Sequence, residues 1–143
     1  MRTDKRILRI LDANFNRSRE GLRVCEEIFR FFLNDAALMK RLKKARHAVT
    51  DLLKRLPQAE ILSARDVRSD EGRERSPLEL KRSGLEDLFS ANIERAKESL
   101  RTLEEFSKIL DPKISVKFKK LRFEVYAIEK RALPKLESLR HRG

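Results

Sequence analysis

The sequence predicts an all-α protein, and three observations support this fold class. Helix-forming residues dominate the chain, and only four glycines and four prolines occur among its 143 residues. Apolar residues recur at helical spacing over long stretches. A fifteen-residue phrase, ANFNRSREGLRVCEE at 13–27, returns as ANIERAKESLRTLEE at 91–105. We therefore expect a pseudo-twofold helical bundle built from two repeated helical hairpins, because one hairpin alone cannot bury its apolar face.

The first half of this bundle spans about residues 6–56. Its first helix is predicted over about 4–33, where the sequence LND interrupts the apolar pattern, and its second over about 35–56. Asn34 is the expected N-cap of the second helix, and Pro57 is its expected stop.

The stretch between the two halves, about 57–84, is predicted to be a long connection. Residues 57–75 lose the helical period and concentrate charge. The sequence SPLE at 76–79 is typical of a helix start, since it combines a capping hydroxyl, a proline in the first turn and a glutamate that can reach back. The pair SG at 83–84 indicates a restart.

The second half, about 85–133, begins with a long helix. After the cap-then-proline pair Asp111-Pro112 a final helix is predicted. Pro134 is expected to bend or end this helix, which leaves 134–143 as a basic tail. The whole chain, 1–143, is expected to be one domain, since its length suffices for a single core.

Composition limits the cellular setting and the partners. No apolar run approaches the ~20 residues that cross a bilayer, and charges interrupt the N-terminal apolar residues, so we expect neither a membrane span nor a signal peptide. The single cysteine, Cys25, agrees with a reducing compartment, and we expect a cytoplasmic protein. The net charge of +12 favours an anionic partner, such as nucleic acid, a membrane surface or a phosphorylated small molecule. A solvated basic surface without any partner explains the charge equally well.

Both halves place polar residues within the apolar face of their first helix. On a helical wheel an amide, a guanidinium and a very small residue share this face in each half: Asn14, Arg17 and Gly21, and then Asn92, Arg95 and Ser99. If the two halves pack face to face, two arginines meet in a buried seam, and a bound anion would relieve their repulsion. Alternatively the arginines reach water at the bundle edge, or pair with carboxylates of the connection.

Further candidates lie outside this face. The sequence KKARHAVTDLLKR at 43–55 aligns with KKLRFEVYAIEKR at 119–131 and places Arg46 on Arg122. Residues on the polar side are spaced for ion pairs within one helix: Glu20, Arg23 and Glu27, and Glu98, Arg101 and Glu105. In the connection, Asp66 and Asp70 stand near Arg65 and could hold Mg²⁺ together with substrate phosphates, or belong to an ordinary charged loop. A glycine-rich phosphate loop is absent from the sequence.

These segments together resemble a helical family of thiamin biosynthesis. The resemblance rests on RILDANFNRSREGLRVCEE, KKARHAV, ARDVRSDEG, ANIERAKESLRTLEEFSKIL and FKKLRFEVYAIEK, and it covers about residues 6–130. The family occurs alone or as the N-terminal domain fused to thiamine-phosphate synthase, and its members are described as monofunctional hydroxymethylpyrimidine-phosphate kinases. The segment DVRSDEG is more charged here than in the family, and the basic tail has no counterpart in it.

The resemblance implies transfer of the γ-phosphate of ATP to hydroxymethylpyrimidine phosphate with the help of Mg²⁺. Chemistry then suggests roles for the candidate residues. Catalytic arginines would be Arg17, Arg95 and Arg65, substrate contacts would come from Asn14, Asn92, Arg46 and Arg122, and the metal ligands would be Asp66 and Asp70. Two alternatives stay open. One is a basic helical module that binds nucleic acid, which is disfavoured because the chain has no Trp, only one Tyr (Tyr126) and no stacking platform of the usual kind. The other is a non-catalytic domain that partners thiamine-phosphate synthase. The sequence also leaves open whether the protein forms a homodimer.

Overall fold

The computed structural model describes residues 3–70 and 81–140, and every regular element within these ranges is helical. The elements are α1 (Lys5–Glu27), the π-helix η1 (Ile28–Phe32), α2 (Ala36–Leu53), α3 (Gln58–Ser63), α4 (Leu85–Leu110) and α5 (Pro112–Arg140). The predicted all-α class is confirmed. The pseudo-twofold relation between the halves and the domain boundaries stay predictions.

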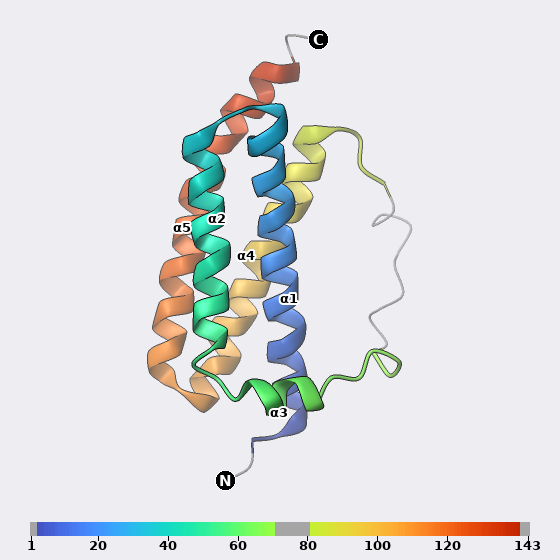
Figure 1. Ribbon diagram of the computed structural model, residues 1–143, viewed down its shortest axis with the longest axis vertical. Helices are drawn as coiled ribbons and strands as arrows, with labels where there is room; N and C mark the ends of the chain where they lie inside the picture. Colours follow the sequence, from blue (N-terminus) through green and yellow to red (C-terminus); the bar gives the residue numbers. More distant parts are fainter. Residues whose placement is uncertain (1–2, 71–80, 141–143) are drawn as a thin grey trace.

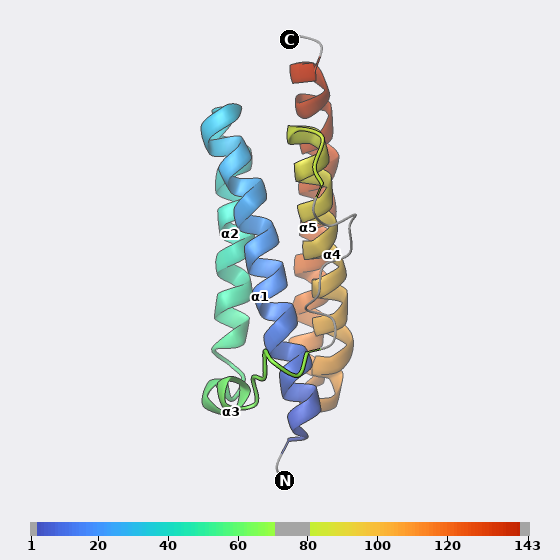
Figure 2. The same ribbon diagram turned by 90° about the vertical axis from the view of Figure 1, so that its right-hand side faces the viewer.

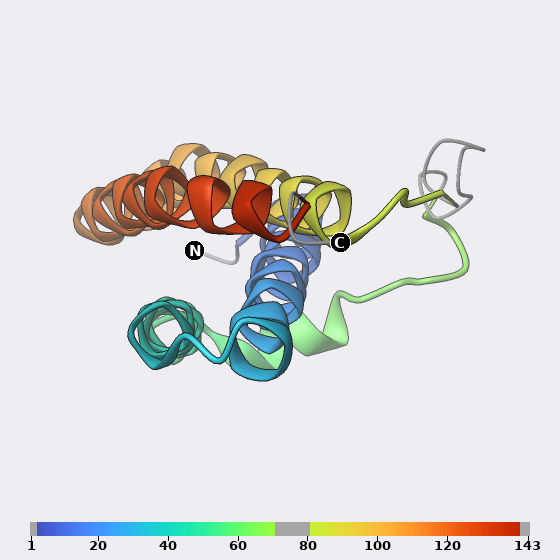
Figure 3. The same ribbon diagram turned by 90° about the horizontal axis from the view of Figure 1, so that it is seen from above.

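The four long helices form two packed hairpins. α1 and α2 make one layer, and α4 and α5 make the other, as the side and top views show (Figures 2 and 3). Between the layers α1 packs mainly on α4, and α2 packs on α5. The short helix α3 crosses the end of the bundle at which α1 begins (Figure 1). The hairpins thus cover each other's apolar faces, as expected of units that cannot bury those faces alone.

The core lies between the two layers and joins them through aromatic contacts. Phe15 of α1 packs against Phe118 of α5, with ring centroids 5.7 Å apart. Phe29 of η1 packs edge-on against Phe89 of α4, also at 5.7 Å. All four rings are fully buried, and each such side chain contributes about 1.5–3 kcal/mol of apolar burial. These contacts hold α1 against α5 and η1 against α4.

Two helix starts follow the sequence prediction. Asp4 caps α1, because its carboxylate accepts a hydrogen bond from the Arg6 backbone nitrogen at 2.8 Å. Asp111 caps α5, because its Oδ1 accepts a bond from the Lys113 backbone nitrogen at 3.0 Å. Each carboxylate thereby satisfies one of the N–H groups that a helix start leaves without an intrahelical partner.

The predicted cap of the second helix was wrong by one residue. Asp35, not Asn34, is the N-cap of α2, and its Oδ1 accepts a bond from the Leu38 backbone nitrogen at 3.0 Å. Asn34 instead adopts a positive φ of 50° in the turn before it. Asparagine tolerates this left-handed conformation better than most residues, so the asparagine serves the turn and the aspartate serves the cap.

Pro134 does not end the final helix, which was one of the two effects expected of it. α5 continues through Pro134 to Arg140, so most of the predicted basic tail is helical. Two contacts beyond the proline offset its missing N–H: Leu136 is buried, and the Lys135 ammonium pairs with the Asp35 carboxylate. Tertiary packing therefore outweighs the local preference of proline to end a helix.

The first helix and the connection differ from prediction in detail. The first helix reaches its expected length, but Ile28–Phe32 has π-helical hydrogen bonding. The second ends at Leu53, slightly earlier than predicted. Within the predicted irregular stretch 57–75, α3 forms because Ile61 is buried against the core. The helix start predicted at 76–79 lies outside the described residues, whereas α4 begins directly after the expected SG pair.

Candidate active site

The two hairpins meet closely where α1 crosses α4. A Cβ atom on Gly21 would lie 2.7 Å from the Asn92 carbonyl oxygen and 3.5 Å from the Ala96 backbone nitrogen, so this backbone contact requires glycine. Arg17 lies one helical turn before Gly21, and Arg95 lies between Asn92 and Ala96. Both arginines therefore lie next to this close backbone contact. We refer to the contact as the α1–α4 seam.

The structure corrects the predicted burial of these two arginines. Arg17 and Arg95 are both exposed, and no ion pair or hydrogen bond joins either side chain to another side chain in residues 3–70 or 81–140. On the wheel both fall just past the buried arc of their helix, on the outer edge of the seam. The alternative in which the arginines reach water is thus the correct one, and the dry arginine seam is not formed.

The repeated asparagines are held within their own helices. The Asn14 side-chain amide donates to the Ile10 carbonyl at 2.8 Å, and that of Asn92 donates to the Leu88 carbonyl at 2.9 Å. Asn14 is buried and Asn92 is partly buried. No described group donates to either side-chain oxygen, so each asparagine keeps an acceptor beside the exposed arginines. The predicted contact of these residues with a substrate stays a prediction.

Arg46 and Arg122 are engaged in equivalent ion pairs within the two hairpins. The Arg46 Nε lies 2.9 Å from Glu26 Oε1, and the Arg122 Nε lies 3.1 Å from Glu104 Oε1. Both glutamates are almost fully buried, at 1% and 4% relative exposure. Each arginine therefore neutralises a buried carboxylate that would otherwise be strongly destabilising. The pairs give both arginines a structural role in joining α1 to α2 and α4 to α5.

The polar faces of α1 and α4 carry one of the predicted intrahelical pairs each, whereas Glu20 and Glu98 form no ion pair with any described residue. Arg23 Nε lies 3.0 Å from Glu27 Oε1, and an Arg101 terminal nitrogen lies 3.1 Å from Glu105 Oε1. The buried glutamates that precede Glu27 and Glu105 were missed by sequence reasoning. Their signal was present, because the repeated EE pair places one glutamate of each half on the inward side of the wheel.

Arg65 is brought to α1 by a carboxylate that the sequence analysis did not single out. Its Nε and a terminal nitrogen lie 2.7 and 2.6 Å from the two oxygens of Asp12. Asn16 also donates to Asp12 Oδ1, at 3.4 Å. One turn earlier on α1, Arg9 donates to the backbone carbonyl of Asp66 at 3.3 Å. Arg65 and Asp66 of the connection are thereby fastened to α1.

At this junction between Arg65 and α1, Asp12 holds a charged arginine that is still partly exposed. The hydrogen bond and charge of Asp12 raise the pKa of Arg65, so the guanidinium stays charged. Asp12 is nearly buried, whereas the Arg65 side chain keeps 43% exposure. Asp12 could have been recognised as a candidate, because it is an aspartate within a helix between two apolar residues, buried Leu11 and partly buried Ala13.

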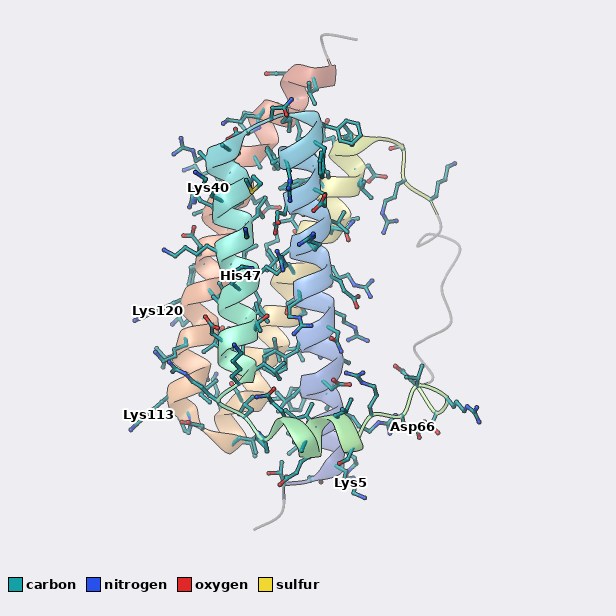
Figure 4. All side chains as sticks on the ribbon, in the orientation of Figure 1. Lys5, Lys40, His47, Asp66, Lys113 and Lys120 are labelled. Carbon is teal, nitrogen blue, oxygen red and sulfur yellow. The ribbon has the colours of Figure 1, made fainter. Side chains whose placement is uncertain are left out.

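The two predicted metal ligands lie beyond this junction. Asp66 is exposed, and hydrogen bonds from Ser69 lower the pKa of its carboxyl, so it is ionised at neutral pH. Figure 4 shows Asp66 beside the N-terminal part of α1, far from the labelled lysines on α2 and α5. Asp70 is partly buried and has an interaction of its own. Within the described ranges no three His, Cys, Asp or Glu side chains gather as a metal-binding group.

Two hollows in the surface lie apart from these residues. One, of about 560 Å³, opens between the start of α4 and the end of α5 and includes Ser83, Asp87 and Leu136 in its lining. The other, of about 370 Å³, runs along α2 beside His47. Neither is lined by a predicted site residue. The exposed seam and the Arg65 junction hold the predicted catalytic residues, and we take these two parts of α1 and its neighbours as the candidate site. No hydrogen bond or ion pair joins the two parts among the described residues.

Comparison with known proteins identifies the family. The model of the ThiD2 family matches residues 9–131, which is most of the chain and includes the seam and the junction. This chain belongs to the ThiD2 family. The resemblance drawn from the sequence is thereby confirmed, and the chain is a domain of thiamin biosynthesis.

Several relatives carry the name thiamine-phosphate synthase. Those of Nostoc punctiforme and Synechocystis sp. are each 41% identical over 124 residues, and that of Rhodopirellula baltica is 38% identical over 122 residues. These matches cover 85–86% of this ThiD2 chain but only 32–35% of each relative, so it spans about a third of their length. No solved structure matches it. Among the described helices, none is long and apolar enough to cross a membrane.

Proposed function

We propose that this ThiD2 chain is a kinase that transfers the γ-phosphoryl group of ATP to hydroxymethylpyrimidine phosphate, giving the diphosphate. One observation carries the proposal. Of the arginines that the repeat keeps in both halves, Arg23, Arg101, Arg46 and Arg122 are all in ion pairs. Arg17 and Arg95 have no ion-pair partner among the described residues, and both flank the same seam. Arg55 and Arg131, the other repeated pair without one, follow α2 and lie on α5, outside the seam. Two unpaired cations at one place suit a substrate with several negative charges.

The chemistry requires positioning and charge neutralisation more than proton transfer. The accepting oxygen belongs to a phosphate that is already ionised at neutral pH, so a strong general base is unnecessary. In phosphoryl transfer most of the acceleration comes from cations placed around the transferred group. Arg17 and Arg95 supply two such cations from facing helices, and Arg65 supplies a third from the junction. The free side-chain oxygens of Asn14 and Asn92 would accept hydrogen bonds from the pyrimidine.

Magnesium fits this site through Asp66. Its carboxylate is exposed and ionised, with one oxygen engaged by the Ser69 backbone nitrogen at 3.1 Å. Kinase magnesium ions are commonly held by one or two carboxylates together with the nucleotide phosphates, so a large protein cluster is not required. Asp66, with Asp70 as a second ligand, would hold the ion, which would neutralise charge on the phosphates of ATP.

The test is an assay of the full chain with ATP, Mg²⁺ and hydroxymethylpyrimidine phosphate, in which the diphosphate is separated by anion-exchange chromatography. Arg17→Ala and Arg95→Ala should each lower turnover about 10²- to 10³-fold, the usual effect of removing one transition-state donor. Arg23→Ala is the matched control. This arginine is also exposed, lies on α1 and has a counterpart in the second half, but it is paired with Glu27. This variant should keep its turnover. Absence of diphosphate from the wild type, or equal losses in all three variants, would refute the proposal.

The length of the relatives favours one alternative, a non-catalytic domain that partners a thiamine-phosphate synthase. About two thirds of each relative lies outside the match with this chain. The alternative predicts no ATP-dependent diphosphate from the isolated chain, and retention of the chain by an immobilised synthase. The same chromatographic assay therefore separates the two candidates.

A further inference from the structure

The Asp12–Arg65 pair links α1 to the connection between the two halves. It joins residues 53 positions apart, and both oxygens of Asp12 contact the guanidinium, at 2.6 and 2.7 Å. The residues around Asp12 on the inner side of α1, Leu8, Leu11 and Phe15, are core residues. A carboxylate at this position weakens the apolar face of its own helix. Such departures from a locally favourable sequence are expected at functional positions.

The geometry leaves much of Arg65 available for another ligand. A guanidinium has five N–H donors in one plane, and two of them are directed at Asp12. Three donors therefore remain, and the side chain keeps 43% exposure. A planar guanidinium held along one edge presents its remaining donors in a fixed direction, which suits a phosphate group.

The backbone next to Arg65 is fixed by a second contact with the same helix. Arg9 donates to the Asp66 carbonyl at 3.3 Å, and the Ser69 nitrogen donates to Asp66 Oδ1 at 3.1 Å. Asn16 adds a donor to Asp12 at 3.4 Å, so the carboxylate cannot rotate without losing contacts. The guanidinium of Arg65 and the backbone carbonyl of Asp66 are thus both tied to α1.

From this arrangement we infer that Asp12 is a positioning residue of the kinase site. It acts through Arg65, whose unused N–H donors it directs toward a phosphate group of the bound substrates. This inference rests on the proposed function and adds a residue to it. Asp12 does not touch substrate in this scheme. Asp12 affects catalysis by fixing the position of the Arg65 guanidinium. Small displacements of such a charged group slow phosphoryl transfer substantially.

The experiment is a double-mutant cycle in the full chain. Steady-state kcat and KM for ATP and for hydroxymethylpyrimidine phosphate are measured for wild type, Asp12→Asn, Arg65→Ala and the double variant. Asp12→Asn keeps the size of the side chain and should lower kcat/KM about ten- to hundredfold. The double variant should be no slower than Arg65→Ala alone, because Asp12 has nothing left to position.

A matched control separates positioning from mere stability. Arg41 and Glu124 form a partly exposed pair between α2 and α5. The Nε and a terminal nitrogen of Arg41 donate to Glu124 Oε1 at 3.0 and 2.8 Å. Glu124→Gln also weakens an ion pair between two elements and should lower Tm, by less than Asp12→Asn because Glu124 is more exposed, without changing kcat/KM. If Asp12→Asn leaves kcat/KM unchanged, or if the effects of Asp12→Asn and Arg65→Ala multiply in the double variant, the positioning role is overturned while the kinase proposal stands. A wild-type chain without turnover overturns both.

Discussion

Replacing Gly21 by alanine tests the close packing of the α1–α4 seam, because two effects of opposite sign compete there. Alanine is a better helix former than glycine by about 1 kcal/mol in a helix interior, so propensity alone predicts a more stable protein. The new Cβ, however, would lie 2.7 Å from the Asn92 carbonyl oxygen, where ordinary contacts begin near 3.4 Å. The neighbouring group is helix backbone and cannot swing aside as a side chain would.

The steric effect should be the larger one. Overpacking a well-packed contact costs about 1–3 kcal/mol, and here α1 and α4 must separate by roughly 0.7 Å to reach ordinary contact. The net loss is then up to about 2 kcal/mol, which corresponds to a fall in Tm of up to roughly 8 °C for a chain of this size. Thermal unfolding followed by circular dichroism at 222 nm measures it.

Ala13→Gly provides the control for helix propensity on the same helix. Ala13 is only partly buried, and this variant should lose about 1 kcal/mol through propensity alone. If Gly21→Ala instead raises Tm, the two backbones are not in the contact described, and the seam that carries Arg17 and Arg95 is misplaced.

Three further predictions concern buried and paired groups. Arg46→Ala leaves the Glu26 carboxylate without its main partner and should cost about 2–4 kcal/mol in urea unfolding; a loss below 1 kcal/mol would show that the pair is dispensable. Lys135 holds the pKa of Asp35 below its usual 3.8, so this pair stabilises the fold at neutral pH and loses that contribution as the pH falls through the lowered pKa; the Tm difference between wild type and Asp35→Asn, which keeps the cap, should therefore shrink steadily as the pH falls below about 4. Burial raises the pKa of the Cys25 thiol, so a disulfide reagent should label it slowly in the native protein and rapidly in denaturant.

The helical architecture was readable from the sequence because it depends on local signals. Capping residues such as Asp4 and Asp111 act within a few residues of their own position, and the apolar period of each long helix needs no knowledge of its neighbours. The predictions failed where a distant contact decided the outcome. α5 passes through Pro134 because Lys135 and Leu136 find partners in the rest of the bundle.

The candidate site was readable only in part for the same reason. The repeat identified Arg17 and Arg95, but their burial depends on a few tens of degrees around the helix axis, which a wheel does not resolve. Arg65 was found by its charge in the connection. Its partner Asp12 lies 53 positions away on α1, and only the folded chain brings the two together. The repeated arginines at 46 and 122 were identified from the sequence, but the buried glutamates with which they form ion pairs were not.

The passage of α5 through Pro134 has a consequence for local opening of the bundle. Proline cannot donate to the carbonyl one turn earlier, so the hydrogen-bond ladder of the helix is interrupted there. The last turns are held to the bundle chiefly by Leu136 and by the Lys135–Asp35 pair. They should therefore exchange amide protons through a fraying event of their own, faster than the rest of α5 and without global unfolding. Asp35→Asn should accelerate this exchange in the last turns while leaving the amides before Pro134 protected.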